Sequence, residues 1–293
     1  MKTVVDLLKE ATAVLKEIDV DTPQLDAEVI LCHLLKTERI QLHIYPERKV
    51  DEEVQEQFWE GIQKRKKRMP VQYIVGTQEF MGLDFRVESG VLIPRADTEI
   101  LVESVLGLYE VHYNNEAVAL MDIGTGSGAI AISLARFIER SKIYAIDLSE
   151  KALEIAENNG RTNEVQHKIS FFYGSLFEPL KGYDLEGTFQ FVISNPPYIP
   201  PDVVEELSPQ VKDYEPRMAL EGGADGLDFY REIVEKAPQY LQMKGWLCFE
   251  IGYDQGEQVK GLMETRGFSR VEVIRDLAGL DRVVIGQWTV ENR

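Results

Sequence analysis

Strand-like and helix-like segments alternate along the chain from about residue 117, and this alternation restricts the fold more than any other feature of the sequence. Residues 117–124 and 142–149 read as buried strands, and each is followed by a segment with helical spacing. Further strand-like segments occupy residues 168–177, 189–195, 245–252, 269–277 and 282–288. Strands that alternate with helices pair in parallel, with helices on both faces of the sheet. We therefore predict an α/β fold with an open, mostly parallel, Rossmann-like sheet.

A glycine-rich turn follows the first of these strands, in the run DIGTGSG at residues 122–128. Its glycines let the chain turn tightly and bring backbone N–H groups close to a ligand at a helix N-terminus. Ligands of open α/β sheets bind at the carboxyl ends of the strands, where this turn lies. The residues of the turn that we expect to bind a cofactor are Gly124, Thr125, Gly126, Ser127 and Gly128.

The second strand ends at Asp147, whose carboxylate can accept hydrogen bonds from both hydroxyls of a ribose. Nicotinamide cofactors and S-adenosylmethionine both carry that ribose, so Asp147 does not distinguish them. Asp122 stands two residues before Gly124, where a carboxylate suits a cationic ligand, and the short loop offers no evident pyrophosphate cradle. These two details favour S-adenosylmethionine, with S-adenosylhomocysteine as the product.

The fourth strand ends in Asn195-Pro196-Pro197-Tyr198, at the same predicted edge as the glycine turn. The prolines fix the backbone and remove two N–H donors. The Asn195 side-chain carbonyl and the Pro196 main-chain carbonyl can then converge on a planar NH₂ group, beside the aromatic wall of Tyr198. Acceptors that strengthen as charge grows on the nitrogen favour the transition state of N-methylation. We predict Asn195, Pro196 and Tyr198 as catalytic, and these residues with Pro197 as substrate-binding.

Residues 1–70 are predicted to form a separate helical domain, because apolar residues recur there at helical spacing. Residues 71–95 alternate apolar and polar side chains around a glycine-containing turn, which predicts a β-hairpin linker. The α/β domain then spans residues 96–293, and Asp97 or Thr98 is expected to cap its first helix.

Charge and cysteine content exclude several classes of protein. The formal net charge of −18 argues against bulk attraction to nucleic acid, although residues 64–68 form a basic run, KRKKR. We interpret this run as the solvated last turn of a helix, with docking of a partner as the alternative. No apolar run approaches the roughly 20 residues that span a membrane. The two cysteines lie far apart and the four histidines show no metal spacing, so we expect a cytoplasmic protein without a metal. We also expect a monomer without a membrane segment or stable nucleic-acid binding.

The sequence closely resembles the PrmC/HemK family of release factor glutamine methyltransferases. The segments that carry the resemblance are PVQYIVGTQEFMGLDF (70–85), VLIPRADTE (91–99), DIGTGSGAIAISLA (122–135), ISNPPYI (193–199), EPRMALEGGADGL (215–227) and DLAGLDRVV (276–284). The resemblance implies a seven-stranded methyltransferase domain joined by a β-hairpin to a small N-terminal helical bundle. It also implies methyl transfer to the glutamine side-chain nitrogen in the Gly-Gly-Gln loop of peptide chain release factors.

The resemblance also implies roles for individual residues. Asn195 is expected to contact the cofactor as well as the substrate, and Phe172 or Leu176 to lie near the adenine. Arg95 is expected to bind the substrate, on a segment that with Glu99 borders the site; the alternative is that Arg95 and Glu99 pack against and cap the following helix. Residues 215–227 shape the substrate groove or turn the chain. We expect the helical domain to dock the release factor, because a short loop alone gives little interface area.

Three other functions remain as alternatives at this point. An adenine amino-methyltransferase acting on DNA or RNA would use a comparable NH₂ group, but it must grip nucleic acid and extrude the base. The residues after Tyr198 leave no room for a sequence-reading domain. A non-enzymatic ligand-binding protein is disfavoured by the intact motifs. A dehydrogenase ranks below both, because no proton-relay residue is evident beside a nicotinamide.

Overall fold

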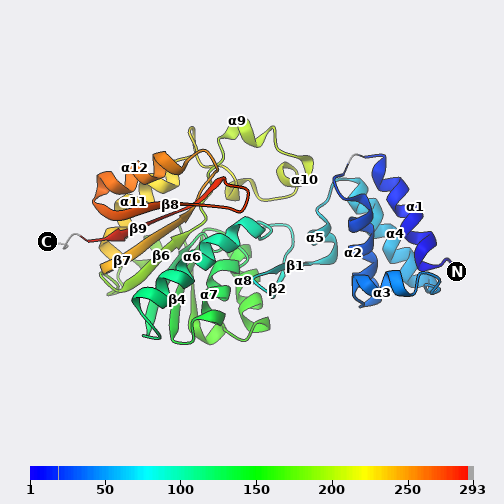
Figure 1. The fold of residues 1–293 in the computed structure, drawn as a ribbon, viewed down its shortest axis with the longest axis horizontal. Helices are drawn as coiled ribbons and strands as arrows, with labels where there is room; N and C mark the ends of the chain where they lie inside the picture. Colours follow the sequence, from blue (N-terminus) through cyan, green and yellow to red (C-terminus); the bar gives the residue numbers. More distant parts are fainter. Residues whose placement is uncertain (19, 290–293) are drawn as a thin grey trace. The chain divides into compact units, whose positions relative to one another are not determined.

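Residues 1–18 and 20–289 are described by a computed structural model of the protein (Figure 1). The chain divides into two compact units. Unit 1 contains the described residues up to Thr77 together with residues 208–214, and unit 2 contains residues 78–207 and the described residues from Glu215 onwards.

Unit 1 is helical, as the apolar spacing predicted. Its helices are α1 (Val4–Lys16), α2 (Pro23–Leu35), α3 (Arg39–Ile44), α4 (Glu52–Lys66), α5 (Val71–Val75) and α10 (Pro209–Lys212). Leu7, Leu15, Leu31, Phe58 and Ile62 are fully buried and form the centre of its core. Segment 208–214 comes from far along the chain, and no local pattern of the first 70 residues indicates that it completes this unit.

Arg65, in the middle of the basic run, does not face solvent. Its side chain is 6% exposed and forms an ion pair with the buried Asp26, with 2.6 Å between Nε and Oδ2. It also donates hydrogen bonds to the Met69 carbonyl (3.1 Å) and to Oε1 of Gln210 in segment 208–214 (3.0 Å). The interpretation of the whole run as a solvated helix turn was therefore wrong for Arg65, because position 65 of α4 faces α2.

Arg65→Ala is expected to lower the free energy of unfolding of unit 1 by about 2 kcal/mol, because it leaves a buried carboxylate without its cation. The loss is below the usual range for a broken buried pair because the Thr22 hydroxyl still donates to Asp26 (2.9 Å). Lys66→Ala, one residue along on the exposed side of α4, is the matched control and should change stability by less than about 0.5 kcal/mol. Denaturant unfolding followed by circular dichroism measures both. Equal stabilities of the two variants would contradict the assignment.

The β-hairpin is present but shorter than predicted. Its strands are β1 (Thr77–Phe80) and β2 (Leu83–Arg86), and residues 71–75, predicted as its first strand, form helix α5. Pro70 precedes this helix and Gly76 ends it in the left-handed region at φ 78°, a common way to terminate a helix. The alternation of VQYIV was too short to distinguish a strand from one helical turn.

Unit 2 contains a seven-stranded sheet in the order β5-β4-β3-β6-β7-β9-β8. Its strands are β3 (Val118–Ile123), β4 (Ser141–Asp147), β5 (Ile169–Tyr173), β6 (Phe189–Ser194), β7 (Leu241–Glu250), β8 (Phe268–Arg275) and β9 (Asp281–Trp288). β3 to β7 pair in parallel, whereas β9 is antiparallel to β7 and β8. The predicted α/β fold with a mostly parallel, seven-stranded sheet is confirmed.

Helices cover both faces of this sheet (Figure 1). The α-helices of unit 2 are α6 (Ala96–His112), α7 (Ala129–Phe137), α8 (Glu150–Thr162), α9 (Pro201–Val204), α11 (Asp228–Tyr240) and α12 (Gly256–Arg266). Side chains alternate between the faces along each strand. Leu120 therefore packs with α6 and α7 in one core cluster, and Met121 packs with α11 and α12 in the other. The five parallel strands end together at one edge of the sheet.

Candidate active site

A pocket lies at the carboxyl ends of the parallel strands in unit 2. Of the residues predicted from the sequence, its walls include Gly124, Gly126, Asp147, Asn195, Pro196 and Pro197. The glycine turn follows β3, Asp147 ends β4 and Asn195 follows β6, so parallel pairing brings these groups to one cavity. The pocket therefore joins the glycine turn and the NPPY segment, which were predicted to lie at the same edge of the sheet.

Asp147 organises the glycine turn from the neighbouring strand. Its carboxylate accepts hydrogen bonds from the backbone N–H of Gly126 (2.8 Å) and of Ser149 (2.9 Å). Burial raises the pKa of Asp147, and these backbone donors act in the opposite direction. Each carboxylate oxygen has further lone pairs, so the group can also accept from a ligand in the pocket.

The residues of the run 122–128 that do not line the pocket stabilise the shape of the turn. Asp122 is fully buried and accepts a hydrogen bond from the Thr125 hydroxyl (2.7 Å). Burial raises the pKa of Asp122 to about 7. Ser127 is buried as well, and Gly128 precedes α7 at φ 84°, where a Cβ would lie 2.7 Å from Ile132. Asp122 therefore acts on the turn through Thr125, whereas the sequence analysis expected it to face the ligand.

Asn159 was missed by the sequence analysis, although it ties the glycine turn to strand β2. Its amide donates to the Ser127 carbonyl (2.9 Å) and to the Arg86 carbonyl (3.0 Å), and its side-chain oxygen accepts from the Arg86 N–H (2.8 Å). The one available signal was an asparagine in a helix interior, on the apolar face of α8. The hairpin strand is thereby held against the glycine turn.

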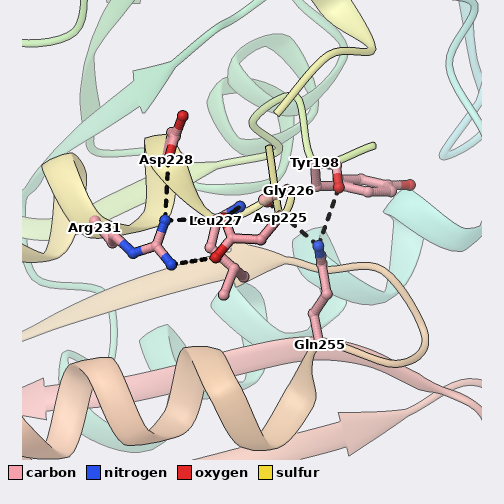
Figure 2. Close-up of polar contacts among 7 residues, drawn as sticks. All are labelled: Tyr198, Asp225, Gly226, Leu227, Asp228, Arg231 and Gln255. Atoms are coloured by element: carbon pink, nitrogen blue, oxygen red, sulfur yellow. Dashed lines mark hydrogen bonds and ion pairs between the residues drawn. The ribbon is translucent and has the colours of Figure 1, made fainter. Parts of the chain in front are cut away.

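The NPPY segment is anchored at both ends. Before it, the Ser194 hydroxyl donates to the Ile123 carbonyl (2.7 Å). After it, the Tyr198 carbonyl accepts from Nε2 of Gln255 (3.0 Å) (Figure 2). Burial, together with the nearby Glu250, raises the pKa of the Tyr198 phenol to about 12, so the phenol is neutral at ordinary pH. Pro196 and Pro197 line the pocket, and Asn195 Nδ2 donates to the Thr98 hydroxyl (3.4 Å).

The segment 215–227 packs against NPPY, and some of its residues line the pocket. Gln255 connects the two, because its amide also donates to the Gly226 carbonyl (3.3 Å) (Figure 2). A Cβ at Gly222 would lie 2.5 Å from the Tyr198 Cα, so the two backbones are in direct contact. Pro216, Met218 and Ala219 line the pocket. The segment therefore contacts the NPPY backbone and lines the pocket.

A cluster of ion pairs connects the segment 215–227 to helix α11. Arg231 bridges Asp225 and Asp228, and its Nη1 lies 2.9 and 3.0 Å from their Oδ1 atoms (Figure 2). Asp225 also accepts from the Leu227 N–H (3.2 Å). This cluster fixes the loop in which Gly226 meets Gln255.

Arg95 and Glu99 are engaged in contacts within unit 2. Arg95 precedes α6 and forms an ion pair with the buried Glu215, and Glu99 accepts from the Met81 N–H at the hairpin turn (2.7 Å). Asp97 and Thr98 lie in the first turn of α6, so neither is its N-cap as expected; α6 begins one residue after Arg95. Thr98 instead faces Asn195.

Leu176 lines the pocket beyond β5, whereas the Phe172 ring stacks on Tyr144 with 5.7 Å between centroids. Leu176 adopts a left-handed backbone conformation at φ 49°. Other residues of the wall were not predicted individually from the sequence, among them Gly90, Val91, Leu92 and Phe229. Val91 and Leu92 belong to the motif VLIPRADTE (91–99), and Gly90 directly precedes it, so this motif was the available signal.

Two absences can be stated for residues 1–18 and 20–289. No group of three or more His, Cys, Asp or Glu side chains in these ranges is arranged to hold a metal ion. No helix within them is long and apolar enough to cross a membrane.

Comparisons with known proteins cover nearly the whole chain. Residues 6–76 match the family model "PrmC N-terminal domain" and residues 98–207 match "Methyltransferase small domain". Release factor glutamine methyltransferases from Bacillus anthracis and Geobacter sulfurreducens are 40% and 41% identical to this chain. The alignments cover 97% and 93% of this chain and 99% and 92% of theirs. The crystal structure of a methyltransferase from Pyrococcus furiosus shares the fold (TM-score 0.52, 20% identity, 72% of this chain and 91% of that chain).

Proposed function

This chain belongs to the release factor glutamine methyltransferase family, and we propose that it methylates the side-chain nitrogen of the glutamine in the Gly-Gly-Gln loop of peptide chain release factors. One observation supports this most strongly: a single pocket is lined by Gly124, Gly126 and Asp147 on one side and by Asn195 and Pro196 on the other. The group proposed to bind the ribose and the two acceptors proposed for the NH₂ group thus border the same cavity.

The residues of the pocket fit S-adenosylmethionine. Asp147 would accept hydrogen bonds from the ribose hydroxyls, and the apolar side chains of Ile146 and Leu176 would contact the adenine. The bound cofactor would supply an electrophilic sulfonium methyl group. The positive-φ glycines of the turn let the backbone approach it without side chains.

Asn195 and Pro196 would hold the amide nitrogen of the substrate. An amide nitrogen is a poor nucleophile because its lone pair is delocalised. Carbonyl acceptors on its two N–H groups interact more strongly as positive charge develops, and so lower the barrier to attack. The nitrogen forms a bond to the methyl carbon, the bond from that carbon to sulfur breaks, and one N–H proton leaves to water.

Asp147→Ala is expected to weaken S-adenosylmethionine binding by about 10- to 100-fold, the effect of losing hydrogen bonds to a charged acceptor. Isothermal titration calorimetry measures the dissociation constant. Asp184→Ala, an exposed aspartate of the same unit, is the matched control and should bind as the unaltered protein does. An unchanged dissociation constant in Asp147→Ala would remove Asp147 from the cofactor site.

A methyl-transfer assay with labelled S-adenosylmethionine tests the substrate. It compares an intact release factor, the same factor with its loop glutamine changed to alanine, and single- and double-stranded DNA and RNA. We expect label on the intact factor alone. Label on nucleic acid alone would transfer the function to the adenine alternative and leave the cofactor site in place.

A further inference from the structure

Glu250 is a buried acid beside the NPPY segment, and the mechanism above does not use it. It ends β7, and the pairing of Ser194 with Phe249 places it next to Asn195 at the edge of the sheet. Glu250 is 2% exposed and Thr98, at the start of α6, is 5% exposed. Three polar side chains from three separate elements therefore meet at one buried position.

The hydrogen bonds of this cluster have a definite direction. Hydrogen bonding by Thr98 and by Asn195 acts to lower the pKa of Glu250, and because a carboxylate can only accept, both side chains would be the donors. Asn195 Nδ2 also donates to the Thr98 oxygen (3.4 Å). Once the Thr98 hydroxyl proton points at Glu250, both neighbours of the Asn195 NH₂ group are acceptors. The Asn195 carbonyl oxygen is then left to face the pocket.

We propose that Glu250 is a positioning residue that acts through Thr98 and fixes the Asn195 amide with its oxygen toward the substrate NH₂ group. An amide rotated by 180° would present its own NH₂ to the substrate NH₂, and binding would fail. The inference rests on the proposed function, because an outward oxygen matters only if the ligand is a donor.

The burial of Glu250 is costly, which argues against a purely structural role. Its Oε2 atom is buried and has no hydrogen-bond partner within the described part of the chain. Burial raises the pKa of Glu250 to about 7, while Thr98, Arg282 and Asn195 act in the opposite direction. A glutamine of the same size would avoid the charge, but its NH₂ would offer a donor where the proposed network needs an acceptor.

The raised pKa gives a testable pH dependence. Below about pH 7 the carboxyl group gains a proton, becomes a donor and loses its hold on the Thr98 proton. Polar and charged groups that act on Glu250 come from α6, the NPPY segment, α11 and β9: Asp97, Thr98, Asn195, Tyr198, Tyr230 and Arg282. The Tyr198 phenol, with its pKa of about 12, does not titrate in this range.

Three substitutions in the full chain test the inference, with release factor as substrate. Glu250→Gln should lower kcat by about 10- to 100-fold, the usual effect of losing a residue that orients a directly acting side chain. Cofactor affinity and the KM for release factor should change little. Thr98→Val should lower kcat about tenfold, and Thr98→Ser, which keeps the hydroxyl, should restore most of it.

The kcat of the unaltered enzyme should decrease as the pH is lowered below about 7, and the kcat of Glu250→Gln should not show this dependence. Glu103→Gln, the same change at an exposed site on α6, is the control.

The outcomes separate this inference from the proposed function. If the unaltered protein does not methylate release factor, the proposed function fails first. If it does, and Glu250→Gln retains kcat or the pH dependence, Glu250 is a structural residue and the inference is overturned. If Glu250→Gln does not fold, the Thr98 pair decides: equal kcat in Thr98→Val and Thr98→Ser contradicts the network.

Discussion

Asn195→Ala is expected to lower kcat for release factor methylation by about 10³-fold and to leave the dissociation constant of S-adenosylmethionine within about threefold. The reason is that the Asn195 oxygen is one of two acceptors proposed to strengthen as charge develops on the substrate nitrogen, and loss of one such group typically has this effect. Single-turnover kinetics gives the rate of the chemical step, and calorimetry gives the affinity.

Asn158→Ala serves as the control for this variant. Asn158 lies on α8, where its side chain accepts a hydrogen bond from Arg161 at the surface (2.8 Å). This change should leave both quantities unaltered. Near-normal turnover in Asn195→Ala would contradict the acceptor mechanism, whereas equal losses of turnover and cofactor affinity would assign Asn195 to cofactor binding.

Gly222→Ala is expected to lower kcat by at least about 100-fold while the protein still folds. A Cβ at this position would lie 2.5 Å from the Tyr198 Cα and 2.7 Å from the Pro197 carbonyl oxygen. These are backbone atoms that cannot rotate away, so NPPY must shift, and displacements near 1 Å at a reacting centre have effects of this size. Initial-rate methylation assays at saturating concentrations of both substrates measure the change in kcat.

The matched control is Gly107→Ala in helix α6. A Cβ there meets nothing within 4 Å among the described residues, and alanine favours the helix. Gly107→Ala should therefore keep full activity and be slightly more stable. If Gly222→Ala were as active as Gly107→Ala, the segment 215–227 would not determine the position of NPPY.

The order of elements in unit 2 was predictable because it depends on local periodicity. β3, β4 and β6 occur where the sequence predicted strands, and each parallel strand delivers its terminal residue to the same edge. Asp147 and Asn195 line one pocket for that reason. Residues 71–75 were predicted wrongly because five residues carry too little periodicity to separate a helical turn from a strand.

Contacts between distant segments were not predictable from one sequence. Thr98 reads as a helix cap, but its hydroxyl meets Asn195 across 97 residues of sequence. Arg65 reads as part of a solvated basic run, but it is buried against Asp26. Leu176 was expected near the adenine from the family resemblance alone, and it reaches the pocket through a left-handed backbone conformation that its neighbours in the sequence do not indicate. In each case tertiary packing determines what the side chain contacts.

Peptide mass spectrometry of release factor after reaction with the purified protein and S-adenosylmethionine tests the central claim most directly. Fragmentation should place one methyl group on the side-chain nitrogen of the Gly-Gly-Gln glutamine, and Asn195→Ala should leave that peptide unmodified. A methyl group on another residue, or on the backbone, would contradict the account of a pocket that holds a side-chain NH₂ between Asn195 and Pro196.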